Sequence, residues 1–81
     1  MSRPRIAIVL PEVGAAPVLL SAWFADPGDT VFEGDRLVEV LVGAATFDVS
    51  SPATGRLAER SVRRNERLVP GQVLGFVELD E

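Results

Sequence analysis

The sequence predicts an all-β fold, a flattened barrel or sandwich of two four-stranded halves related by approximate two-fold symmetry. Three observations support this prediction. Short apolar segments alternate with turn signals rich in Gly, Pro and Asp along the whole chain, which is typical of β-barrels and sandwiches. No segment has a sustained helical period, and only residues 57–68 form a weak helix candidate. Residues 31–40 and 68–77 resemble each other, which indicates an internal repeat.

The repeat relates the two halves at a constant spacing of 37 residues. Gly34 matches Gly71, and Leu37 matches Leu74. A half of this size is too small to bury its apolar face alone, so we expect the halves to pack against each other. In this arrangement the centre of the chain lies at one end of the molecule, and the chain termini meet near the other.

Residues 37–49 predict a β-hairpin at the centre of the chain. Acidic residues alternate with apolar ones on both arms, with Glu39 on the first and Asp48 on the second. This period of two places apolar side chains on one face of the hairpin. Gly43 interrupts the apolar run where a turn needs a permissive backbone. The predicted tip is therefore apolar and chemically inert.

The other strands follow from similar apolar runs bounded by turn residues. We expect strands at 5–10, 18–24, 57–62 and 73–79, with brief ones at Val31 and Leu68. Leu20 and Trp23 are the expected core anchors of the second strand. Glycines at four predicted turns are expected to serve the backbone conformation. They are Gly28, Gly34, Gly55 and Gly71.

Length and composition indicate one folded domain that spans residues 1–81. The chain is 47% hydrophobic and 25% charged, with a net charge of −4, which is ordinary for a small globular domain. No apolar run approaches the roughly 18 residues of a membrane helix. The run at 6–10 is also shorter than the apolar part of a signal peptide. We therefore expect a cytoplasmic protein that does not enter a membrane.

The missing residue types exclude most catalytic chemistry. The chain has no His, Cys, Lys or Tyr, which removes the usual general bases, the amine nucleophile and the thiol. Only carboxylates could bind a metal, and none has the spacing of a calcium loop. We expect no catalytic residues and no metal site, and hence a protein that is not an enzyme.

Five short motifs follow one another along the chain. They are LPEVG at 10–14, LSAWFADPGDTV at 20–31, GDRLVEV at 34–40, SPATGRL at 51–57 and PGQVL at 70–74. Their order and spacing resemble the lipoyl domains of 2-oxo acid dehydrogenase acyltransferases, and more broadly the biotinyl/lipoyl carrier family. The resemblance covers nearly the whole chain and implies the flattened barrel already predicted.

The resemblance implies a group carrier, but the attachment residue is replaced. The family attaches lipoyl or biotinyl to a lysine at the hairpin tip, and that cofactor does the chemistry. Here the aligned position is Ala44, and the preceding Glu, Thr and Asp of lipoyl domains are replaced by Leu41, Val42 and Gly43. The loop from Leu10 to Trp23 is also shorter than in lipoyl domains. We therefore expect the family's fold without its cofactor.

The altered tip suggests contact with a protein partner. Leu41 should turn outward, at a position where the family usually has Glu. We expect an exposed docking patch formed by Leu41, Val42, Gly43 and Ala44, because contiguous exposed apolar groups often mark partner surfaces. In the alternative interpretation, Val42 and Ala45 simply plug the end of the barrel.

Five of the eight basic residues lie within residues 56–67, beside two glutamates. We expect these arginines to form a solvated face with local ion pairs. An acidic protein surface is a better partner for them than nucleic acid. The chain is acidic overall and is expected to lack exposed aromatic side chains, so no nucleic-acid binding is predicted.

The sequence thus predicts a lipoyl-domain-like binding or structural module without an amide-linked arm. It would dock within a larger assembly, for which a 2-oxo acid dehydrogenase complex is one candidate. The alternative is a degenerate lipoyl or biotinyl carrier domain of an acyltransferase or carboxylase system. A third class, the membrane-fusion adaptors of efflux systems, also contains lipoyl-like halves, but the helical hairpin and membrane anchor of that class are missing here.

Overall fold

The computed structural model describes residues 3–80, which form eight β-strands and no helix. The strands are β1 (Arg5–Val9), β2 (Val18–Trp23), β3 (Thr30–Val31), β4 (Arg36–Val42), β5 (Ala45–Ser50), β6 (Gly55–Arg60), β7 (Arg67–Leu68) and β8 (Val73–Leu79). The predicted all-β class is confirmed. The weak helix candidate at 57–68 is wrong, because this stretch contains most of β6, a turn and β7.

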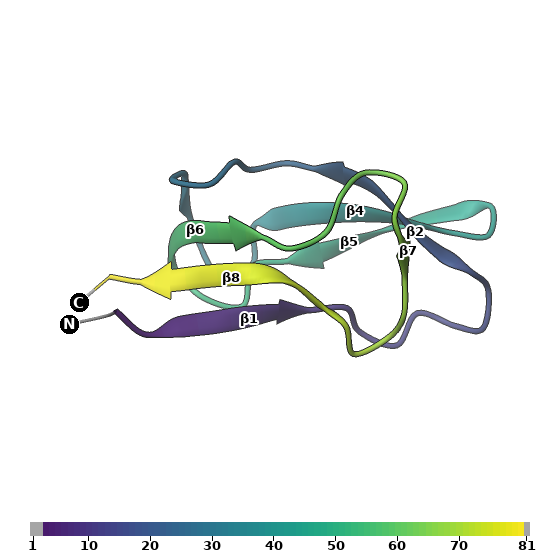
Figure 1. The fold of residues 1–81 in the computed structure, drawn as a ribbon, viewed down its shortest axis with the longest axis horizontal. Coiled ribbons are helices and arrows are strands. Elements are labelled where there is room, and N and C mark those ends of the chain that lie inside the picture. Colours follow the sequence, from purple (N-terminus) through teal and green to yellow (C-terminus); the bar gives the residue numbers. More distant parts are fainter. Residues whose placement is uncertain (1–2, 81) are drawn as a thin grey trace.

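The strands form two four-stranded antiparallel sheets that pack face to face (Figure 1). One sheet has the order β1-β8-β6-β3, and the other has the order β5-β4-β2-β7. The molecule is elongated, with extents of 41 × 19 × 18 Å. The tip of the β4–β5 hairpin lies at one end of the long axis, whereas β1 begins and β8 ends at the other. The predicted opposition of hairpin and termini is therefore confirmed.

The internal repeat extends through most of the fold. The bounds of β2, β3 and β4 recur 37 residues later as the bounds of β6, β7 and β8. The bulge between Leu20 and Ala22 in β2 recurs between Leu57 and Glu59 in β6. Strand β4 pairs with β5 and β2, just as β8 pairs with β1 and β6. The approximate two-fold symmetry predicted from the sequence is confirmed.

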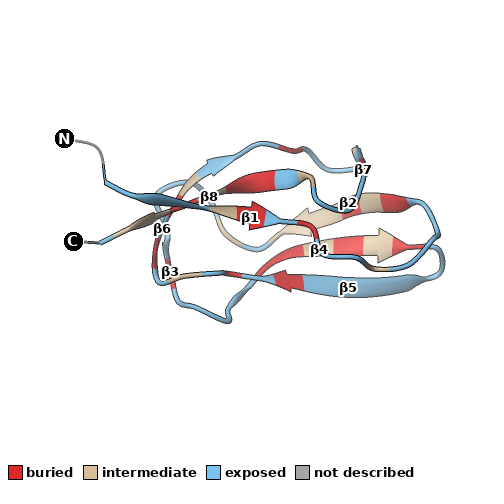
Figure 2. Ribbon diagram, turned by 90° about the horizontal axis from the view of Figure 1, so that it is seen from below, coloured by how far each residue is buried: buried red, intermediate tan, exposed pale blue. Residues whose placement is uncertain are grey.

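The core lies between the two sheets and is built from aliphatic side chains (Figure 2). A register shift between Arg36 and Val38 lets the adjacent Leu37 and Val38 both face inward, as bulges commonly do. The buried apolar residues are Ile8, Leu10, Val18, Leu20, Val31, Leu37, Val38, Val40, Val42, Val49, Leu57, Val62, Leu68, Leu74 and Val77. The one buried polar side chain within residues 3–80 is Ser51, whose hydroxyl donates to the Ala53 carbonyl at 2.7 Å.

Three expectations about large or special residues need correction. Trp23 is half-buried at the rim of the core rather than inside it. Phe24, Phe32 and Phe47 are exposed, so the chain does present aromatic side chains. Gly55 is the first residue of β6 rather than a turn residue.

Among the described residues there is no helix long and apolar enough to cross a membrane.

Candidate functional site

The β4–β5 hairpin closes through a two-residue turn formed by Gly43 and Ala44. Val42 and Ala45 pair on either side of this turn. Gly43 has φ 60°, and Asn65 is the only non-glycine of residues 3–80 with positive φ. In a type II′ turn the first central residue has positive φ and the second does not, as found here for Gly43 and Ala44. This turn type suits the twist of hairpin strands. Gly43, Ala44 and Ala45 are all exposed, so the turn places Ala44 at the solvent-facing tip.

The loop between β1 and β2 lies against this tip. The Gly43 amide donates to the Pro17 carbonyl at 3.4 Å. A Cβ atom on Gly43 would lie 3.5 Å from the Cβ of Ala16, which is ordinary contact. The turn and the loop therefore lie together at one end of the molecule (Figure 1).

The structure divides the four residues predicted for the docking patch. Gly43 and Ala44 are exposed and Leu41 is half-buried, whereas Val42 is only 8% exposed and belongs to the core. Strand alternation explains this result, because Val40 and Val42 face inward and Leu41 faces outward. The inclusion of Val42 in an exposed patch was wrong. Of the two residues expected to plug the barrel in the alternative interpretation, Val42 is buried and Ala45 is not.

Leu19 is a neighbour of Leu41 that the sequence reasoning missed. The two residues are directly opposite each other on β2 and β4, and Thr46 is opposite Leu41 on β5. Directly paired residues of antiparallel strands share one face of the sheet. Leu19 and Leu41 are both half-buried, so the outer face of this sheet carries an apolar pair. We call Leu19, Leu41, Gly43 and Ala44 the hairpin patch.

The fold and the hairpin geometry agree with comparisons to known proteins. A family model described as "Biotin-requiring enzyme" matches residues 7–77. The chain belongs to the biotin/lipoyl family. A solution structure of the lipoyl domain of the 2-oxoglutarate dehydrogenase complex from Azotobacter vinelandii has the same fold. It superposes with a TM-score of 0.66 at 22% sequence identity, over 95% of each chain. A search of curated proteins returned no match.

In this biotin/lipoyl domain, the two sheets differ at the positions equivalent to the apolar pair. The residues 37 positions after Leu19 and Leu41 are Arg56 and Glu78, which are directly opposite each other on β6 and β8. The Arg5 guanidinium also lies 3.8 Å from the Glu78 carboxylate. One sheet therefore has charges on its outer face where the other has leucines. The repeat spacing, combined with strand alternation, was the sequence signal that could have identified Leu19.

The hairpin end of this biotin/lipoyl domain offers no reactive group. The sequence contains no lysine, and the tip residues have only hydrogen, methyl or aliphatic side chains. Among residues 3–80 no three His, Cys, Asp or Glu side chains are grouped so that they could hold a metal ion. The arrangement can bind a surface through apolar contact, but it has no side-chain amine on which an amide-linked group could be carried.

Proposed function

We infer that this domain is a binding module with the carrier fold that holds no amide-linked lipoyl or biotinyl arm and docks within a larger protein assembly. The observation that carries the inference is Ala44, which lies at the exposed hairpin tip in a chain without lysine. An amide-linked arm requires a primary amine at this point. In this proposed role the domain does not itself catalyse a reaction.

The hairpin patch is the proposed docking surface. Leu19 and Leu41 form an apolar pair on the outer face of one sheet. The equivalent positions on the other sheet hold Arg56 and Glu78. The fold therefore tolerates charge there, and the leucines are not required by the architecture. Covering such a pair with a partner removes apolar area from water, which favours association. The candidate assembly is a 2-oxo acid dehydrogenase complex, the kind of complex from which the Azotobacter vinelandii lipoyl domain comes.

The test is capture of dehydrogenase components from the native host by the tagged domain, with partners identified by mass spectrometry. We expect Leu41→Glu to lower the captured amount about tenfold, because central interface residues often contribute more than about 1 kcal/mol. The double variant Leu19→Arg/Leu41→Glu should fold, since it copies the Arg56–Glu78 pair of the other sheet. It should also lose the partner.

Phe32→Glu is the matched control, because like Leu41→Glu it adds one negative charge and removes apolar surface. Phe32 is 58% exposed and lies in the turn before β4, at the opposite end of this strand from the hairpin tip. Capture should survive this change. Equal capture by the native domain and by Leu41→Glu would contradict docking through the hairpin patch, and capture of unrelated proteins alone would contradict the dehydrogenase assignment.

A degenerate carrier domain of an acyltransferase or carboxylase system is the second candidate. One observation favours it: the hairpin keeps an exposed two-residue turn with Ala44 at the outermost point. Such a domain would keep a carrier role and would need a mode of attachment that uses no lysine. It predicts that substitutions in the hairpin patch leave all protein contacts unchanged, which the same capture experiment measures.

A further inference from the structure

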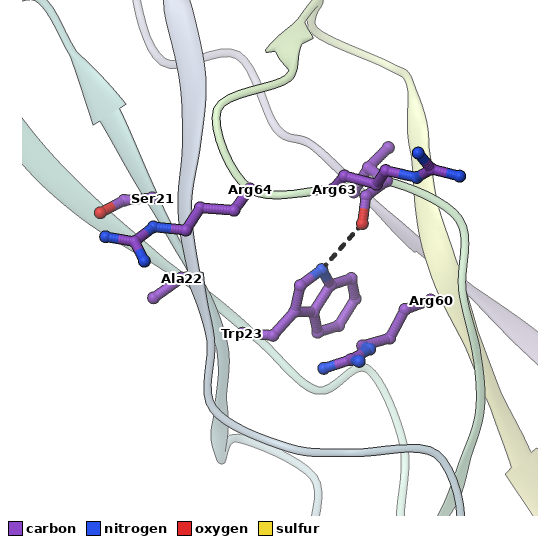
Figure 3. Close-up of a pocket in the computed structure, with 7 residues that line it drawn as sticks. Ser21, Ala22, Trp23, Arg60, Arg63 and Arg64 are labelled. Atoms are coloured by element: carbon purple, nitrogen blue, oxygen red, sulfur yellow. Dashed lines mark hydrogen bonds between the residues drawn. The ribbon is translucent and has the colours of Figure 1, made fainter.

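A groove of about 650 Å³ lies between the end of β2 and the connection from β6 to β7 (Figure 3). Its walls combine one indole with three guanidinium groups. Its lining includes Ser21, Trp23, Arg60, Val62, Arg63 and Arg64. None of these residues belongs to the hairpin patch.

The floor of the groove is held in place by Trp23. The indole Nε1 donates to the Val62 carbonyl at 3.1 Å, which ties β2 to the segment after β6. The Arg60 guanidinium lies 5.9 Å from the centre of the indole ring, within cation–π range. Arg60 also pairs with the Asp26 carboxylate at 3.1 Å. The aromatic part of the groove is therefore preorganised by neighbouring groups.

Arg63 and Arg64 form the open part of the groove. Their loop is fixed by its backbone, since the Arg63 amide donates to the Glu66 carboxylate at 3.0 Å and the Asn65 amide donates to the Leu20 carbonyl at 2.8 Å. Both arginines are exposed. Within residues 3–80, no carboxylate lies within 4.0 Å of either guanidinium. Two cationic side chains thus extend from an anchored loop in a chain whose net charge is −4.

The guanidinium groups are spread along the groove and do not converge on a point. In Figure 3 Arg64 extends across β2 toward Ser21, whereas Arg63 extends to the opposite side of the indole. A compact anion could meet only one of these side chains at a time. An extended chain with several carboxylates could pair with each in turn, and Arg forms strong two-point hydrogen bonds to carboxylates.

We propose that this groove binds an extended acidic segment of a protein partner. The carboxylates pair with Arg63 and Arg64, and the apolar part of the segment lies over the exposed edge of Trp23. This contact is separate from the hairpin patch, so it stands even where docking through that patch fails. Charge complementarity of this kind favours rapid and selective association, and added salt weakens it.

Trp23 provides a direct test, because it is the only tryptophan and the chain has no tyrosine. A hexaglutamate peptide with blocked termini is titrated into the domain while tryptophan emission is followed. We expect a saturable change that weakens with salt. Arg63→Ala/Arg64→Ala should lower the affinity about tenfold, as the loss of two exposed ion pairs would.

Arg56→Ala/Arg67→Ala is the matched control, since it removes the same charge from exposed positions that do not line the groove. This control should bind the peptide as the native domain does, and so should Leu41→Glu. Equal weakening by both arginine pairs would show attraction to net charge alone and overturn the proposal. It would also be overturned by the absence of a saturable change, or by equally strong binding of tripolyphosphate, which would indicate a site for free anions.

Discussion

At the scale of single residues, Gly55 shows how closely the strands of this fold approach one another. A Cβ atom at this position would collide with the Glu78 carbonyl oxygen and would lie 3.2 Å from the Leu79 Cα. Both obstacles are backbone atoms of β8, which cannot rotate away. Gly55 is therefore required by contact between neighbouring strands, since its own φ is not positive.

We expect Gly55→Ala to lower the free energy of unfolding by about 1–3 kcal/mol, the range typical of overpacked core positions. Urea unfolding followed by Trp23 emission measures the change. Gly28→Ala is the control, since nothing lies within 4 Å of a Cβ there and only its φ of 97° opposes a side chain. A loss at Gly55 no larger than that at Gly28 would contradict the steric explanation.

Single residues were also where sequence reasoning was least complete. The motif SPATGRL suggests that Gly55 is a turn glycine. Its actual role could not be predicted from the motif, because it depends on the close approach of β8, which lies far along the chain. Trp23 looks like a core residue by its apolar neighbours, yet its indole reaches the Val62 carbonyl at the rim. By contrast, strand alternation alone could have placed Val42 inside the barrel. Val42 lies inside because it shares the inward face of β4 with Val40, whereas the turn residues Gly43 and Ala44 do not continue this alternation.

At the scale of elements, the two halves repeat their turns in detail. Gly28 follows β2 and Asn65 follows β6, and Asn65 comes 37 positions after Gly28. Their amides make equivalent hydrogen bonds, from Gly28 to the Leu57 carbonyl and from Asn65 to the Leu20 carbonyl, each at 2.8 Å. Both residues have positive φ, 97° for Gly28 and 69° for Asn65. The same turn is thus built once with glycine and once with asparagine.

This equivalence predicts that Gly28→Asn is tolerated, with a loss of less than about 1 kcal/mol in the free energy of unfolding, because asparagine adopts positive φ more readily than other side chains. Gly28→Val should cost clearly more, since a β-branched residue is a strong outlier at positive φ. Thermal unfolding of the three proteins compares them directly. Similar losses for Asn and Val would show that the two turns are not equivalent.

The elements themselves were largely predictable. The motifs at 34–40 and 70–74 located the turns before β4 and β8, and the spacing of 37 residues related the halves. The equivalence of β1 and β5 was harder to predict from the sequence. The loop after β1 is longer than the loop after β5, so these two strands are not separated by the constant spacing of 37 residues. The groove at Trp23 was not predicted either, since it joins residues 21–23 to residues 60–64 only in the folded chain.

At the scale of the whole molecule, the halves exchange strands. Strands β1 and β3 of the first half pair with β8 and β6, whereas β7 of the second half pairs with β2. Each sheet therefore contains strands from both halves. The two halves together form one elongated molecule with the hairpin at one end. This shape, shared with a lipoyl domain at a TM-score of 0.66, places the hairpin tip and the adjoining loop between β1 and β2 at one end of the molecule.

The most direct test of an arm-less carrier fold is the intact mass of the domain after production together with lipoate and biotin ligases. Ala44→Lys is measured beside it, and an authentic lipoyl domain serves as the positive control. We expect the native chain to keep its unmodified mass, whereas Ala44→Lys, with an amine at the exposed turn, gains the mass of the attached group. A lipoyl- or biotinyl-sized increase on the native chain would contradict the central claim.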